Sequence, residues 1–296
     1  MKDYRRIQKT GESTYILSLP KKWADRNSVS SGTEASIKEN EDGSLTVSVK
    51  KEVKEASAVI HSTQDVERTL QKIIAAYLAG YQQIAVKGKN AAIVCEEARL
   101  KLSGIEILGE KDEEGTLGVL ANDKFSIDEI LSRMYSISLT LFSLLGRTLE
   151  GEKDLDKEAS RREQEIDRLY ILGLRVINTQ STKLSVGVCK ALAIKTIERI
   201  SDHLAQSYEK QTIKDKQILS LVNELKMLYS EVFENLVNLR NADNTLVKIS
   251  AFHDKIEKLG KTSAGNTREH LLRISEYLVD LVEITEDLIS IRNFFG

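Results

Sequence analysis

The sequence predicts a multidomain, mainly α-helical protein with a small β head, a small α/β sandwich and a C-terminal domain of tandem three-helix bundles. Three observations favour this class. The 296 residues exceed what one compact core usually holds, so two or three domains are expected. Pro20 is the only proline in the sequence, which is typical of helix-rich chains because proline interrupts helices. Aromatic residues make up only 5%, which argues against a mainly β protein.

Residues 1–50 predict short strands joined by turns. Thr10–Gly11 and Asp42–Gly43 are turn signals, and Pro20 ends a strand and favours a helix directly after it. The expected elements are strands at 6–8 and 15–19, a helix at 21–26, and strands at 35–38 and 45–49.

Residues 51–121 predict a small open α/β sandwich, because strands alternate with two helices there. The expected elements are strands at 58–61 and 83–86, helices at 65–78 and 91–102, and a hairpin of 105–108 with 117–120. The first of these helices carries an apolar stripe that a core beneath it would bury. Its members are Val66, Leu70, Ile73, Ile74 and Tyr77.

Residues 122–296 predict six helices. Ser126 followed by Glu129 is a capping box, and an apolar stripe with helical spacing follows it. The expected helices cover 126–150, 156–180, 185–210, 215–241, 245–260 and 266–293. Short connections between long helices imply antiparallel neighbours and hence two three-helix bundles. The repeated layout of 126–210 and 215–293 indicates an internal duplication.

Charge is unevenly distributed along the chain. Residues 1–26 hold seven Lys or Arg against three Asp or Glu, whereas the remaining residues hold 36 basic and 42 acidic side chains. A basic head on an acidic body indicates that the head meets an anionic partner. No segment approaches the roughly 20 apolar residues of a membrane span, so membrane insertion is not expected.

Cysteine usage and the N-terminal segment favour a cytoplasmic protein. Cys95 and Cys189 lie far apart in apolar surroundings, so they are expected to be buried thiols rather than a disulfide or a zinc site. The N-terminal segment MKDYRRIQKTGE lacks the apolar run of a secretory signal.

The segment that follows Tyr4 carries a motif. It reads RRIQKTGESTYILSLPKKW and combines a basic first strand, Ser-Thr before a second strand, a strand-ending Pro-Lys-Lys and a later Gly32 at a turn. It resembles the AbrB/SpoVT/MazE family of swapped-hairpin DNA-binding domains over residues 1–50. The resemblance implies a homodimer whose chains interleave their hairpins into one barrel, and so short a segment cannot bury a core alone.

Basic and hydroxyl side chains of this head are the candidates for DNA contact. They are Arg5, Arg6, Lys9, Ser13, Thr14, Lys21 and Lys22. The arginines would face the major groove or the phosphates, and the two lysines after Pro20 would contact phosphates. Glu12 departs from the family pattern and would repel phosphate. The alternative is a solvated strand edge whose charges only prevent aggregation.

Two pairs of carboxylates stand four residues apart in consecutive predicted helices. Glu163 and Asp167 form one pair, and Glu198 and Asp202 form the other; this spacing places each pair on one helix face. If the helices are neighbours, the carboxylates converge and need a positive charge to neutralise them. A hard divalent or trivalent cation with oxygen ligands would do so. The alternative is a set of surface salt bridges with basic residues on the same helices.

The second of these helices carries a signature. Its segment IERISDH at 197–203 resembles the ERIGDH signature of the PhoU family of phosphate-uptake regulators, and Glu163 with Asp167 resembles that family's E-x-x-x-D motif. The resemblance covers about 120–296. It implies tandem helical bundles that bind metal clusters, often iron, with manganese, zinc or magnesium as alternatives. It also implies contact with a phosphate ABC transporter or its signalling proteins, and with the head added the chain resembles the archaeal type of PhoU regulator.

The second repeat departs from that pattern. At the positions equivalent to the four carboxylates it has His253, Glu257, Leu272 and Glu276, and Asp280 follows one turn later. Leu272 is not a ligand, so a second metal site is weakened. Whether His253, Glu257, Glu276 and Asp280 form a degenerate site stays open from the sequence.

These observations predict a regulator rather than an enzyme. The sequence contains no P-loop, G-x-G-x-x-G after a strand, H-E-x-x-H or G-x-S-x-G motif. The expected function is transcriptional control of phosphate uptake: a dimeric head binds DNA, and the helical domain senses metal, phosphate state or a protein partner. The alternatives are a metal-dependent phosphohydrolase on the carboxylate bundle and a scaffold that docks phosphate-transporter components without binding DNA.

Overall fold

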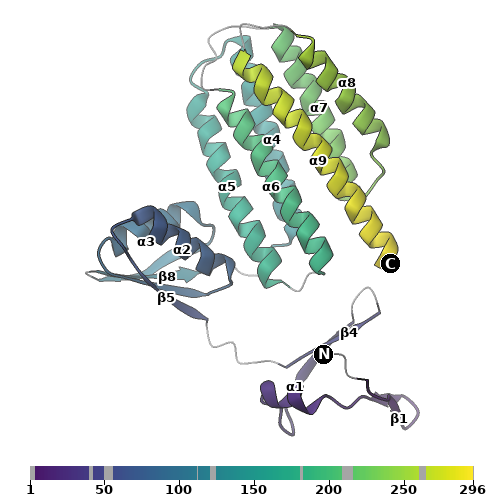
Figure 1. Cartoon of the computed structure of the whole chain (residues 1–296). Helices are drawn as coiled ribbons and strands as arrows, with labels where there is room; N and C mark the ends of the chain where they lie inside the picture. The colour runs from purple at the N-terminus through teal and green to yellow at the C-terminus, as the bar shows by residue number, and fades with distance from the viewer. Residues whose placement is uncertain are drawn as a thin grey trace. The chain divides into compact units, whose positions relative to one another are not determined.

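The computed structural model describes residues 4–39, 43–49, 56–111, 113–120, 125–180, 183–208, 216–259 and 265–295. The chain forms two compact units, Met1–Lys54 with Phe295–Gly296, and Glu55–Phe294. Helices predominate in the described ranges (Figure 1), which confirms the mainly α, multidomain prediction. Across those ranges, the helices lack the combination of length and apolarity that crossing a bilayer requires.

The head, Met1–Lys54, contains two antiparallel hairpins and one short helix in its described part. Its elements are β1 (Gln8–Thr10), β2 (Thr14–Ile16), α1 (Lys21–Arg26), β3 (Ala35–Glu39) and β4 (Leu45–Val49). β1 pairs with β2 across the Gly11 turn, where φ is 70°, and β3 pairs with β4. The strand predicted at 15–19 stops at Ile16, because β1 offers only three residues for pairing. Of the predicted Asp42–Gly43 turn, Asp42 lies outside the described residues, and Gly43 has a φ of 73°.

Within the described residues of the head, no side chain is buried. Large apolar side chains are exposed instead: Tyr4, Ile7, Tyr15, Ile16, Leu17, Leu19, Ile37 and Leu45. Ile37 on β3 is 67% exposed, and Tyr15 on β2 is 68% exposed. A unit of this size that leaves so much apolar surface in water is marginal on its own.

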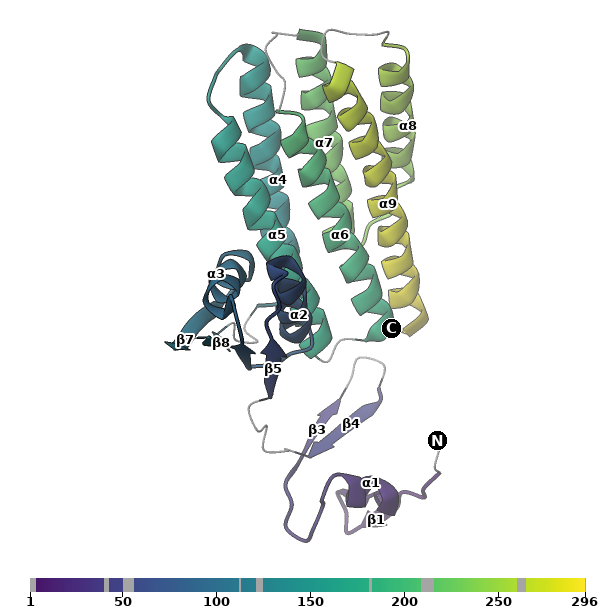
Figure 2. The ribbon, with the colours of Figure 1, turned by 60° about the vertical axis from the view of Figure 1, so that its left-hand side comes forward.

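The second unit begins with a two-layer α/β part. Its elements are β5 (Ser57–His61), α2 (Val66–Leu78), β6 (Gln83–Lys87), α3 (Ala91–Lys101), β7 (Ile105–Lys111) and β8 (Glu114–Val119). The strands lie in the order β5-β6-β8-β7, with β5 parallel to β6 and the other neighbours antiparallel. α2 and α3 lie on one face of the sheet (Figure 2), and a core that includes Tyr77 and Ile84 fills the layer between them. The predicted strands and helices are confirmed here to within a few residues.

The rest of the second unit is helical, as predicted. Its helices are α4 (Ile127–Glu150), α5 (Asp156–Thr179), α6 (Leu184–Gln206), α7 (Lys216–Asn238), α8 (Asp243–Glu257) and α9 (Gly265–Phe295). The Glu129 N–H donates to Ser126 Oγ and the Ser126 N–H donates to the Glu129 carboxylate, which confirms the capping box. α4 packs against α5, α6 and α7, and buried side chains from α4 to α9 form one continuous core. The two predicted three-helix groups therefore share a single core.

Helix α5 joins the helical part to the α/β part. The Arg175 guanidinium, on a residue only 3% exposed, donates hydrogen bonds to the carbonyls of Tyr77 and Gly80. It also lies 4.7 Å from the centroid of the Tyr77 ring. Asn178 Nδ2 donates to the Leu78 carbonyl at 3.2 Å. Directional contacts thus fix the end of α2 against α5.

Candidate metal centre

Three of the four predicted carboxylates converge between α5 and α6. Glu163 and Asp167 come from α5 and Asp202 from α6, and one oxygen of each lies within 4.8 Å of the others. The helices approach closely because Gly173 has no side chain; a Cβ there would lie 3.0 Å from Ile194 Cδ1. The spacing of four residues on α5 directs both of its carboxylates towards α6. Glu163, Asp167 and Asp202 are called the acidic cluster below.

Glu198 lies beside the acidic cluster but is neutralised by its own helix. It is only 8% exposed, and both of its carboxylate oxygens accept hydrogen bonds from Lys195 Nζ at 2.6 Å. The salt-bridge alternative therefore holds for Glu198. It does not hold for the acidic cluster, since no ion pair engages these carboxylates within the described ranges. Arg162, for example, pairs with Glu158 and Glu165 instead.

Burial and mutual repulsion raise the pKa of every member of the acidic cluster. The pKa of Asp202 rises to about 7, first because the carboxyl is half-buried and then because other carboxylates surround it. Those carboxylates belong to Glu198, Asp167 and Glu163. Burial and neighbouring carboxylates likewise raise the pKa values of Glu163 and Asp167, although nearby lysines oppose the shift at Asp167. A shared cation would relieve this repulsion.

The donor set suits a hard cation. Carboxylate oxygens are preferred by magnesium, manganese and iron, whereas zinc more often takes nitrogen or sulfur. His203 follows Asp202 directly, but its Nδ1 lies 2.8 Å from His270 Nδ1 in a hydrogen bond between α6 and α9. Cys95 and Cys189 are buried free thiols, as predicted, and neither belongs to the cluster. Among the expected metals, the cluster therefore fits magnesium, manganese or iron better than zinc.

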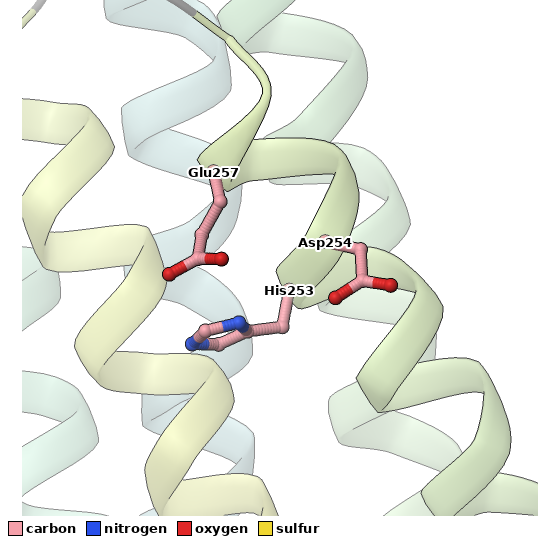
Figure 3. Close-up of side chains that lie close together, drawn as sticks. All are labelled: His253, Asp254 and Glu257. Carbon is pink, nitrogen blue, oxygen red and sulfur yellow. The ribbon is translucent and has the colours of Figure 1, made fainter.

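Helix α8 brings together a different set of residues. His253, Asp254 and Glu257 of α8 place their ligand atoms within 4.8 Å of one another. Figure 3 shows His253 and Glu257 on the same side of α8, with Asp254 directed to the other side. Glu276 and Asp280 of α9 do not join this group among the described residues; they line a cavity together with His253. Spacing of four residues does not reveal Asp254, because it is adjacent to His253 in the chain.

Every predicted DNA-contacting residue of the head is exposed to solvent. The set comprises Arg5, Arg6, Lys9, Ser13, Thr14, Lys21 and Lys22. Most of these residues precede or belong to the β1–β2 hairpin, and the last two begin α1. The hairpin and the helix start therefore carry positive charge and hydroxyl groups on their exposed surface.

Comparison with known proteins returns no relative. No family model, no curated protein and no solved structure matches the chain. The PhoU and AbrB resemblances therefore stand on the residues of IERISDH and RRIQKTGESTYILSLPKKW.

Proposed function

We propose that the chain is a transcriptional regulator of phosphate uptake, with a dimeric DNA-binding head and a cation-sensing helical domain. The observation that carries the proposal is the head, where exposed basic side chains and uncovered apolar side chains share one small unit without a buried residue in its described part. Apolar surface of this extent favours a partner chain, and exposed positive charge favours an anion. The link to phosphate rests on the IERISDH segment.

A second copy of the head is the partner that fits best. The hairpins are short, and side chains such as Tyr15 and Ile37 face water on both of them. Two interleaved copies would bury these side chains in one shared core, which a single copy of this length does not build. The same pairing would double the number of basic side chains presented to a ligand.

Duplex DNA is the anion that fits a doubled basic surface. Lysine and arginine side chains that neutralise phosphates release condensed counterions, and this release supplies affinity that falls steeply with salt. In each chain Arg5 and Arg6 precede β1, and Lys9 lies within it. A dimer would therefore place two such sets against the two strands of a duplex.

The acidic cluster supports a sensing role for the helical domain. A cation bound by Glu163, Asp167 and Asp202 would remove the repulsion between α5 and α6 and hold the two helices together. A ligand shifts a conformational equilibrium only by its differential affinity for the two states. Relief of that repulsion would give the cation a higher affinity for the state in which α5 and α6 lie close together. The contacts of α5 with α2 would transmit this change of state to the α/β part.

The proposal is tested by measuring DNA affinity in two metal states of the full chain. Fluorescence anisotropy with a short labelled duplex would compare protein stripped with EDTA and protein loaded with Mn²⁺. We expect binding in at least one state and an affinity difference of at least roughly threefold between them. The double variant Glu163→Gln/Asp167→Asn should abolish that difference, whereas Lys153→Ala/Lys157→Ala, at exposed positions of the helical domain, should retain it.

Two results obtained with the same protein preparation would favour the alternative functions. Dimers that bind no DNA in either metal state would indicate a scaffold. Turnover of p-nitrophenyl phosphate by the Mn²⁺-loaded protein, lost in Glu163→Gln, would indicate a phosphohydrolase.

A further inference from the structure

A cavity of about 530 Å³ lies between α8 and α9, away from the acidic cluster. Leu246, Ile249 and Val279 form its apolar walls, and His253, Glu276 and Asp280 add polar groups. Its volume falls within the range of small-molecule sites, and its lining combines apolar surface with a few charged groups, as such sites do.

The surroundings of the cavity are strongly acidic. Glu276 and Asp280 line it, and Asp254 and Glu257 lie next to His253 on the same helix. Arg273 pairs with Glu276 at 2.6 Å. No ion pair engages the carboxylates of Asp254, Glu257 or Asp280 within the ranges that the structure covers. The cavity therefore favours a cationic occupant.

The placement of these carboxylates favours an extended cation over a single metal ion. The ligand atoms that lie within 4.8 Å of one another all belong to α8, and Glu276 and Asp280 on α9 are not among them. A metal ion held by that group would therefore take its ligands from α8 alone, whereas a molecule with separated charges can engage both helices. Alkyl groups between those charges would pack against Leu246, Ile249 and Val279.

We propose that this cavity binds a small aliphatic amine that carries two or more ammonium groups. One ammonium group would donate hydrogen bonds to Asp280 and to Glu276 Oε1, the oxygen that Arg273 does not engage. The second would lie near Glu257 on α8, and the alkyl chain would cover the apolar walls. Such a site adds a small-molecule input to the second repeat, separate from the cation at the acidic cluster.

The test uses putrescine, a four-carbon chain with an ammonium group at each end, and the full-length protein. Isothermal titration calorimetry should detect one site for putrescine and no binding of the matching neutral diol. Asp280→Asn and Glu276→Gln should each raise the dissociation constant at least roughly fivefold, because each removes one charged hydrogen-bond acceptor. Glu286→Gln, an exposed position on another face of α9, should leave it unchanged.

A variant that fills the cavity distinguishes binding inside it from nonspecific attraction of cations to the acidic surface. Ser250 lines the cavity and is exposed, so Ser250→Trp should fill the space without disturbing the core. We expect this variant to lose putrescine binding and to keep the wild-type melting temperature. Equal putrescine affinity in all variants, or binding of Mn²⁺ but not putrescine at this cavity, would overturn the proposal. Glu163→Gln should not affect putrescine binding, so the result is independent of the acidic cluster.

Discussion

At the scale of single residues, Asp202 is the most perturbed member of the acidic cluster. Burial and three neighbouring carboxylates raise its pKa to about 7. A carboxyl whose pKa is higher in the fold than in the unfolded chain stabilises the fold most when protonated. That contribution is fully present below the unfolded pKa of roughly 3.9 and is lost as the pH rises to about 7. Above about pH 7 Asp202 is ionised, and in the metal-free protein no cation offsets its repulsion from the neighbouring carboxylates.

The variant Asp202→Asn removes that charge and should stabilise the metal-free protein at high pH. The gain should be about 1–2 kcal/mol after allowance for solvent screening of a half-exposed group, or a few degrees in melting temperature. Differential scanning fluorimetry in EDTA, from about pH 4 to pH 8, measures it. The gain should shrink towards pH 4. Asp254→Asn, at an exposed position, should show no comparable gain, and a gain of equal size at every pH would contradict the electrostatic explanation.

Cation binding by the acidic cluster can also be measured directly. The double variant Glu163→Gln/Asp167→Asn should weaken Mn²⁺ binding at least roughly tenfold, because it removes two of three oxygen ligands. Isothermal titration calorimetry with the full chain measures this change. Asp156→Asn, at an exposed position in the first turn of the same helix, should bind Mn²⁺ as the wild type does. Equal weakening in both variants would show that the cluster is not the binding site.

At the scale of elements, α5 contacts both α6 and the α/β part. Its middle turns present Glu163 and Asp167 to α6, and its C-terminal turns hold the α/β part through Arg175 and Asn178. Arg168, next to Asp167, also donates to the Leu100 carbonyl at the end of α3, at 3.4 Å. We therefore expect a change at the acidic cluster to reach the α/β part through α5.

Removal of the buried guanidinium should loosen this attachment. Arg175→Ala leaves the carbonyls of Tyr77 and Gly80 without their donor, which costs about 2–4 kcal/mol. Hydrogen–deuterium exchange should therefore accelerate in α2 at least roughly tenfold. Arg161→Ala, on the same helix at an exposed position, should leave the exchange unchanged. Wild-type protection in Arg175→Ala would show that the attachment lies elsewhere.

Sequence patterns predicted most of these elements because the patterns are local. The helix at Lys21–Arg26 follows from Pro20, and the start of α4 follows from the Ser126 and Glu129 pair. Strand order is not local: β8 lies between β6 and β7, where Gly118 accommodates the Leu108 side chain. A Cβ on Gly118 would lie 2.5 Å from Leu108 Cδ1, a contact that only the assembled sheet reveals.

The sequence predicted the members of the acidic cluster but also assigned Glu198 to it. Spacing identified Glu163, Asp167 and Asp202, because residues four apart share a helix face. It placed Glu198 in the same set, but the rotamer of Lys195 decides otherwise, since Lys195 Nζ reaches both of its oxygens. Lys195 lies three residues before Glu198 on α6, so residue spacing allows this pairing, and the side-chain conformation decides that it forms.

At the scale of the whole molecule, the head and the second unit differ in how they are held together. The second unit has two cores of its own, whereas the described head has no buried side chain. In the proposed dimer the head would gain stability from association, and the exposed apolar side chains of its hairpins would form the shared surface.

A single charge on that surface should separate the subunits. Ile37 is 67% exposed in the monomer, so Ile37→Asp does not disturb a monomer core but would bury a charge in a dimer. Sedimentation equilibrium should show a dimer for the wild type and a monomer for the variant. Leu184→Asp changes an 83% exposed leucine at the start of α6 and should remain a dimer. Dimers of Ile37→Asp would place the association surface outside the hairpins.

The salt dependence of DNA binding in Arg5→Ala/Arg6→Ala tests the central claim most directly. Anisotropy titrations of the full chain with one duplex, between about 50 and 200 mM salt, give the slope of log affinity against log salt. The account predicts an affinity at least roughly tenfold lower than wild type and a shallower slope, because each subunit loses up to two phosphate contacts. Wild-type affinity and an unchanged slope in the double variant would contradict it.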